Sequence, residues 1–170
     1  MAHRRAYIHT LSEAAAQTHR DIADGRERLE IRYLPSVSMG DDVPFILDAL
    51  FAAREQDVRR MVTSVGPHRD DVQILVEGRD LRAFGSQGQQ RTAALAMRLS
   101  ELEVMRGELG EWPMLMLDDV MSELDPGRRR QLVGRIRGIQ TFITCTDFDD
   151  LAGAEPGRAW RVKGGQLSEL

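Results

Sequence analysis

One short apolar run constrains the fold of this chain more than any other feature. Pro113 opens a run of four apolar residues, 114–117, which ends in the carboxylates of Asp118 and Asp119. Such a run is typical of a strand that is buried on both faces of a parallel sheet. A second buried strand is expected at 141–146, and a helix separates the two. This order predicts an α/β fold in which helices cover a parallel sheet.

The other elements follow from the spacing of apolar residues. Apolar side chains recur at helical intervals in three segments and alternate with polar ones in the strands. The expected helices span 2–28, 45–62 and 89–107. The expected strands span 29–34 and 72–76, and the chain is expected to turn back in a short strand at 80–83. Asp125 as N-cap and Pro126 in the first turn predict one more helix, and 160–170 is expected to form a hairpin. The first helix has a narrow, alanine-rich stripe, which suits an arm packed on one partner helix.

Composition and charge exclude several classes of protein. The chain has 170 residues, of which 42% are hydrophobic and 29% charged, as in soluble globular proteins. It contains neither an apolar run that could cross a bilayer nor a signal peptide, so we expect a cytoplasmic protein with no membrane partner. Cys145 is the single cysteine, which excludes an internal disulfide, and we expect it to be a buried thiol. A net charge of −4 excludes a polycation that coats DNA by charge alone.

The cationic residues exclude one kind of nucleotide site. Lys and Arg together number 23, and Lys163 is the only lysine among them. A P-loop requires a lysine after its second glycine because that lysine bridges the terminal phosphates of the nucleotide. Lys163 stands in Val-Lys-Gly-Gly, so this sequence contains no P-loop.

The polar segment 84–92 reads Phe-Gly-Ser-Gln-Gly-Gln-Gln-Arg-Thr and directly precedes a predicted helix. Gly85 and Gly88 permit backbone conformations closed to other residues and allow a ligand to approach the main chain. Ser86 supplies a hydroxyl, and the helix directs its N-terminal amides and partial positive charge toward a docked group. These features predict a phosphate-contacting loop. A solvated loop with a serine N-cap is the alternative.

The two acids after 114–117 stand where α/β folds place their ligands. One carboxylate there is suited to holding Mg²⁺ through water, and its neighbour is suited to deprotonating a water that attacks a phosphate. The alternative is that the pair caps the next helix. The segment 122–125, Ser-Glu-Leu-Asp, follows shortly after.

Taken in chain order, these segments resemble the C-terminal half of an ABC-type ATPase head. The loop 86–89 is similar to the signature, 114–119 to the Walker B strand and 122–125 to the D-loop. The turn 66–71 and the pair Asp-Asp in place of Asp-Glu are similar to the RecF family. That family comprises bacterial recombination mediators of the structural-maintenance branch of ABC ATPases.

The resemblance implies a role for each matching residue. The signature residues would contact the γ-phosphate of an ATP held by the opposite protomer of a head-to-head dimer: Ser86, Gln87, Gly88 and Gln89. Ser122 and Asp125 would cross the dimer interface and report on the partner's nucleotide.

The resemblance also assigns roles to the two acids and to a switch position. Asp118 would support Mg²⁺ through water, and Asp119 would be the general base. Thr146 stands before Asp147, at the place of the histidine that senses the γ-phosphate in transporters. Because threonine replaces that histidine, its sensing role is in doubt.

The likeness covers essentially the whole chain. Residues 1–62 are similar to the end of a helical arm with a short strand, and 63–170 to the C-terminal lobe of the head. The family's N-terminal lobe, with its P-loop, is absent, so we expect a fragment that is inactive alone. The resemblance implies ATP and Mg²⁺ as cofactors. As partners it implies double-stranded and gapped DNA with single-stranded junctions, RecR, RecO and RecA-type proteins, a second copy bound on ATP, and the missing N-terminal lobe.

Other interpretations stay open from the residues alone. The chain could be half of another structural-maintenance ATPase, or a non-catalytic module that docks on a separate N-terminal half. Asp118, Asp119 and Asp147 could form the site of a metal-dependent nuclease.

The turn 66–71 is open to two interpretations. His68 and Arg69 would belong to a nucleotide or DNA surface, or the segment is a tight turn with Asp70 or Asp71 as a cap. We favour the turn. The arginines 128–130 are expected to form a solvated helix face, with contact to DNA phosphates as the alternative.

Overall fold

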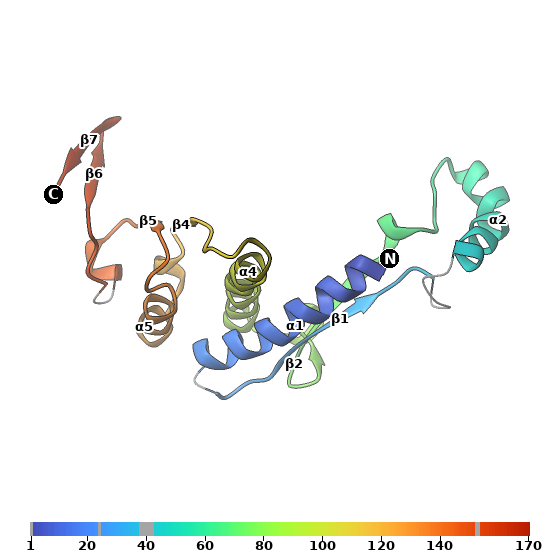
Figure 1. Cartoon of the computed structure of the whole chain (residues 1–170), viewed down its shortest axis with the longest axis horizontal. Helices are drawn as coiled ribbons and strands as arrows, with labels where there is room; N and C mark the ends of the chain where they lie inside the picture. The colour runs from blue at the N-terminus through green and yellow to red at the C-terminus, as the bar shows by residue number, and fades with distance from the viewer. Residues whose placement is uncertain (1, 24, 38–42, 152–153) are drawn as a thin grey trace. The chain divides into compact units, whose positions relative to one another are not determined.

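The computed structural model describes the chain except residues 1, 24, 38–42 and 152–153 (Figure 1). It divides into two compact units, Met1–Pro113 and Met114–Leu170, which we describe separately. The family resemblance predicts a domain boundary at residue 62. The division into compact units does not test that boundary, which stays a prediction. None of the helices in the described part of the chain is long and apolar enough to cross a membrane.

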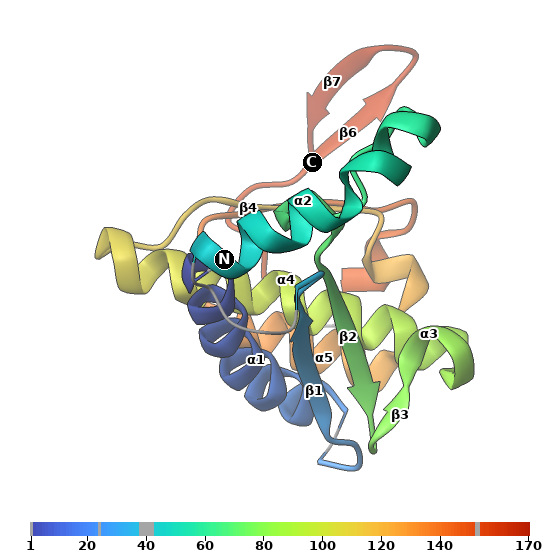
Figure 2. The ribbon, with the colours of Figure 1, turned by 90° about the vertical axis from the view of Figure 1, so that its right-hand side faces the viewer.

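The first unit combines a three-stranded antiparallel sheet, in the order β1-β2-β3, with helices (Figure 2). Its elements are α1 Ala2–Ile22, β1 Leu29–Leu34, α2 Val43–Arg60, the 3-10 turn η1 Pro67–Arg69, β2 Asp71–Val76, β3 Arg79–Asp80, α3 Leu81–Phe84 and α4 Gln87–Leu109. Helix α1 packs against both α4 and β1. The arm helix therefore has the partner helix that its narrow stripe predicted, and a strand in addition.

Small side chains let α1 and α4 approach closely. Ala15 of α1 and Ala93 and Ala96 of α4 are fully buried. The hydroxyls of Ser100 and Thr18 are hydrogen-bonded at 3.0 Å inside this contact, and Ser100 Oγ also donates to the carbonyl of Ala96 at 2.7 Å. Because each buried hydroxyl has a partner, the polar pair avoids the cost of an unsatisfied buried group.

Two predicted boundaries in the first unit are wrong. The first helix ends at Ile22 rather than 28, because the chain turns at Gly25, whose φ of 72° lies in the left-handed region that glycine tolerates. The return strand expected at 80–83 comprises only Arg79–Asp80. Asp80 instead caps α3, since its carboxylate accepts the amides of Arg82 and Ala83, each at 3.0 Å.

The second unit contains the predicted strand–helix–strand. Strands β4 Leu115–Asp118 and β5 Thr141–Thr144 pair in parallel, and α5 Pro126–Arg135 lies between them in sequence. The remaining elements are the 3-10 turns η2 Met121–Glu123 and η3 Phe148–Leu151 and the hairpin β6 Trp160–Lys163 and β7 Gln166–Glu169. The core of the unit consists of Leu115, Leu117, Met121, Leu124, Leu132, Ile136 and Leu151.

The expectation that both parallel strands are buried on both faces is wrong for this chain. Leu115 and Leu117 are buried, but Met116 is 77% and Phe142 46% exposed. Side chains alternate between the faces of a strand, and the apolar cluster of this unit covers only one of those faces. The second strand also ends at Thr144, two residues before the predicted end.

Candidate nucleotide-site residues

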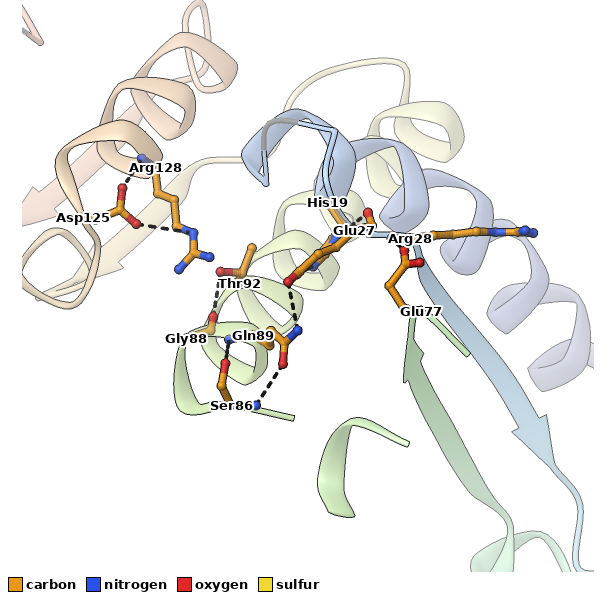
Figure 3. Close-up of polar contacts among 10 residues, drawn as sticks. All are labelled: His19, Glu27, Arg28, Glu77, Ser86, Gly88, Gln89, Thr92, Asp125 and Arg128. Atoms are coloured by element: carbon orange, nitrogen blue, oxygen red, sulfur yellow. Dashed lines mark hydrogen bonds and ion pairs between the residues drawn. The ribbon is translucent and has the colours of Figure 1, made fainter. Parts of the chain in front are cut away.

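The serine of the predicted signature loop is the N-cap of α4. Ser86 Oγ accepts the amide of Gln89 at 3.2 Å, and Gln89 Oε1 accepts the amide of Ser86 at 2.9 Å (Figure 3). This reciprocal pair is a capping box. The cap uses one lone pair of the hydroxyl, whose hydrogen remains able to donate to an anion. The N-cap interpretation therefore describes the structure without excluding contact with phosphate.

The first turn of α4 adds two features suited to an anion. Gln87 and Gly88 occupy its first two positions, where helical geometry leaves backbone amides without an acceptor in the helix. The helix is 23 residues long, and its dipole places partial positive charge at this end. Amides and dipole together favour a negatively charged group beside Ser86.

Gly85 is needed for a reason other than the one expected. Its φ of −75° is open to any residue, so no special dihedral requires glycine. A Cβ at this position would lie 2.5 Å from the carbonyl oxygen of Leu81. The loop is therefore able to cross the end of α3 only because the side chain is absent.

A side chain from the segment between α1 and β1 contacts the capping box. Gln89 Nε2 donates to Glu27 Oε1 at 2.9 Å (Figure 3), and Glu27 lies between α1 and β1. The imidazole of His19, fully buried in α1, lies 3.9 Å from the other carboxylate oxygen of Glu27. Sequence reasoning missed Glu27 and His19, because Glu27 is 62 positions from Gln89 and no motif links them.

The two acids lie at the C-terminal end of β4, as predicted. Asp118 is the last residue of the strand, Asp119 follows it, and both are exposed. Thr144 Oγ1 donates to Asp118 Oδ1 at 2.5 Å and accepts the amide of Asp119 at 3.0 Å. Sequence reasoning missed Thr144. The parallel register, which pairs Thr144 with Asp118, is the only feature that singles it out.

The predicted D-loop residues make contacts within their own unit. Ser122 Oγ donates to the carbonyl of Asp119 at 2.8 Å. Asp125 is the N-cap of α5, as predicted, and accepts the amides of Gly127 at 3.0 Å and Arg128 at 3.1 Å. The Arg128 amide, together with the Arg128 guanidinium and the Gly127 amide, holds the pKa of Asp125 below its usual range. The roles of Ser122 and Asp125 at a dimer interface stay predictions.

The switch position lies just beyond β5. Thr146 is exposed in a bend, and its role stays a prediction. The neighbouring Cys145 is half-buried rather than fully buried as expected. Burial raises the pKa of its thiol, and the carboxylates of Asp150, Asp147 and Asp119 raise it further.

The turn 66–71 is held by the buried carboxylate of Asp70. This side chain is 2% exposed, accepts hydrogen bonds from the Tyr33 hydroxyl and, at 2.8 Å, from the Ser36 amide, and lies 3.7 Å from Arg4. Burial raises the pKa of Asp70, but the hydrogen bonds from Ser36 and Tyr33 and the charge of Arg4 outweigh it, so the pKa is lowered.

The two cationic residues of the turn bind the chain itself. His68 and Arg69 both contact the carbonyl of Thr63, at 2.9 and 2.8 Å. The favoured structural interpretation of the turn therefore agrees with the geometry. Asp70 acts as an anchor between segments rather than as a cap.

The nuclease interpretation lacks the cluster that it needs. Within the described ranges, no three His, Cys, Asp or Glu side chains gather closely enough to hold a metal ion. Asp118, Asp119 and Asp147 therefore form no such triad. A single carboxylate at a strand end still fits Mg²⁺, which takes one or two protein carboxylates and fills its other positions with water and phosphate oxygens.

Comparison with known proteins points to one family. No protein-family model matches the chain. The DNA replication and repair protein RecF of Symbiobacterium thermophilum is 48% identical over 94% of this chain and 46% of the relative. RecF of Geobacillus thermodenitrificans is 46% identical over 87% of this chain and 42% of the relative. The chain thus spans less than half the length of these curated relatives.

Solved structures agree with the sequence comparison. The structure of the recombination mediator protein RecF-ATPrS in the RecFOR pathway matches with a TM-score of 0.82 and 37% identity, over 98% of this chain and 45% of that one. An SMC head bound to the C-winged helix domain of ScpA matches with a TM-score of 0.57 at 13% identity, which shows a shared fold alone. The fold is that of the C-terminal lobe of an ABC-type ATPase head.

Proposed function

Because this chain corresponds in sequence and in fold to the C-terminal part of RecF, we propose that it is the signature-bearing lobe of an ATPase of DNA repair and recombination. The observation that carries the proposal is the match to a nucleotide-bound RecF over 98% of the chain at 37% identity. The capped start of α4 and the acids at the end of β4 supply the chemistry that such a lobe requires.

The signature loop would bind the terminal phosphate of a nucleotide held by a second protomer. The Ser86 hydroxyl retains a hydrogen to donate, and Gln87 and Gly88 present amides at the positive end of α4. Gln89 would act indirectly, since its side chain completes the capping box and bonds to Glu27. Binding across two protomers makes ATP a clamp for a homodimer.

The acids of β4 would supply the metal support and the general base. Asp118 would hold Mg²⁺ through water, and the bound ion neutralises charge on the phosphates. Asp119 would accept the proton of the attacking water. Ser122 and Asp125 would lie at the dimer interface, and Thr146 at the switch position.

Hydrolysis by this lobe requires a P-loop from elsewhere, since its only lysine is Lys163. We expect the N-terminal half of a RecF to supply it. The assembled protein would work in the cytoplasm on double-stranded and gapped DNA, with RecR and RecO, to load a RecA-type protein.

The test is calorimetric titration of ATP-Mg²⁺ into the chain alone and into the chain mixed with the N-terminal half of the Symbiobacterium RecF. We expect binding and slow hydrolysis only in the mixture. Asp119→Asn is expected to retain binding, to accumulate the ATP-bound dimer and to lower hydrolysis by about 10²-fold or more. Asp147→Asn is the matched control. Tight binding of ATP by the chain alone would contradict the proposal.

A non-catalytic module is the second candidate, favoured by the absence of a P-loop and by the exposed apolar face of β4 and β5. It predicts that the two halves associate but that the mixture hydrolyses no ATP. Measurement of ATP hydrolysis by the mixture distinguishes the two functions.

A further inference from the structure

The residue after β4 has an unusual backbone conformation. Asp119 has a φ of 52°, in the left-handed region, directly after the strand ends at Asp118. Most residues other than glycine disfavour this region because Cβ crowds the following carbonyl oxygen, although aspartate and asparagine adopt it more often than others. Such a conformation persists only where surrounding contacts hold it, and these residues cluster at functional sites.

Two side chains hold the backbone of Asp119. The amide donates to Thr144 Oγ1 at 3.0 Å, and the carbonyl accepts from Ser122 Oγ at 2.8 Å. Thr144 comes from β5, and Ser122 comes from η2. The left-handed residue is therefore fixed on both sides of its Cα atom.

The hydroxyl of Thr144 makes a second contact, to the side chain of Asp118. It donates to Asp118 Oδ1 at 2.5 Å. The directions of both bonds are determined, since an amide only donates, an ionised carboxylate only accepts and a hydroxyl does each. The parallel register of β4 and β5 sets Thr144 opposite Asp118. One hydroxyl thus joins the side chain of the first acid to the backbone of the second.

We propose that Thr144 is a positioning residue of the ATPase site, which orients the Asp118 carboxylate and holds Asp119 in its left-handed turn. The inference rests on the proposed function, which assigns Mg²⁺ to Asp118 and the general base to Asp119. Mg²⁺ demands near-octahedral geometry, so the direction of a carboxylate that supports it matters. The turn matters because a continued strand would send the two acids to opposite faces.

The first test uses the 170-residue chain itself and no nucleotide. Thr144→Val removes the hydroxyl and keeps the branched shape that strands favour, whereas Thr144→Ser keeps the hydroxyl. Thr141→Val is the matched control, because the Thr141 hydroxyl donates to the carbonyl of Ile139 at the other end of β5. Hydrogen exchange of the Asp119 amide, followed by NMR, is expected to accelerate about tenfold in Thr144→Val and to stay near wild type in the other two. An unchanged rate in Thr144→Val would overturn the inference.

The second test uses the chain assembled with the RecF N-terminal half and measures the Mn²⁺ concentration that gives half-maximal ATP hydrolysis. We expect this concentration to rise by about 10- to 100-fold in Thr144→Val and to return toward wild type in Thr144→Ser. Equal values in wild type and Thr144→Val would overturn the positioning role. Absence of hydrolysis by the wild-type assembly would instead overturn the proposed function, while the exchange experiment still decides whether Thr144 holds Asp119.

Discussion

The two candidate regions of this chain are held in different ways. At the start of α4, Ser86 and Gln89 bond to each other across three positions of sequence. At the end of β4, the acids depend on Thr144, 26 positions from Asp118. The start of α4 is thus capped by its own residues, whereas the acids acquire their geometry only when two strands pair.

The cores that support these regions also differ. In the first unit α1 packs against both α4 and β1, with a buried hydrogen bond between Ser100 and Thr18. The second unit leaves Met116 and Phe142 exposed. Hydrogen bonds between neighbouring residues cap the starts of helices, whereas hydrogen bonds between distant residues join separate elements of a unit.

The largest loss of stability is expected from a substitution that breaks a contact between distant residues of the first unit. Asp70→Ala removes the buried acceptor of the Tyr33 hydroxyl and the Ser36 amide, and leaves both donors without it. We expect the free energy of unfolding to fall by about 3 kcal/mol. Asp71→Ala is the matched control, because the exposed Asp71 carboxylate accepts the amide of the adjacent Val72, and it should cost no more than about 0.5 kcal/mol. Urea denaturation measures both, and similar losses would refute the anchoring role of Asp70.

Removal of a helix cap should cost less stability than Asp70→Ala, and the cost should be similar in the two units. Ser86→Ala in the first unit and Asp125→Ala in the second each remove an N-cap, which costs about 1 kcal/mol. Ser86→Asp and Asp125→Asn keep a cap acceptor and are expected to recover most of that loss. Urea titrations of the four variants provide the measurement. A loss above that of Asp70→Ala would reverse the order that the comparison predicts.

The contact between Glu27 and Gln89 should contribute less to stability than the helix caps do. Gln89 bonds to Glu27 at the part-buried edge of the first unit. A double-mutant cycle with Glu27→Ala and Gln89→Ala is expected to give a coupling free energy of about 0.5 to 1 kcal/mol. Additive effects of the two substitutions would show that the contact contributes nothing to stability.

The smallest expected effect is the dependence of the free energy of unfolding on pH. The pKa values of Asp70 and Asp125 are lowered in the folded chain, so each carboxylate contributes stability that is fully present above about pH 4. That contribution is lost as the pH falls through the lowered folded-state values, because the unfolded chain then binds more protons. Unfolding free energies should therefore be similar at pH 7 and 5 and lower at pH 3, with a smaller decrease in Asp70→Asn. An equal acid dependence in wild type and Asp70→Asn would exclude Asp70 as a source.

Patterns within a few neighbouring residues were enough to predict much of this protein. The apolar run before Asp118, the helical spacing after Ser86 and the Asp125-Pro126 pair correctly predicted the parallel strands, helix α4 and the capped start of α5. Each depends on hydrogen bonds or periodicity among consecutive residues, which a single sequence displays directly.

Only the tertiary structure decided the contacts that join distant residues. Nothing in the sequence links Glu27 to Gln89, Thr144 to Asp118, or Asp70 to Tyr33, because packing and strand register bring these pairs together across 26 to 62 positions. The exposure of Met116 was likewise decided only by the tertiary structure. An apolar residue in a strand indicates that burial is favourable, but which face is covered depends on the elements that the folded chain brings there.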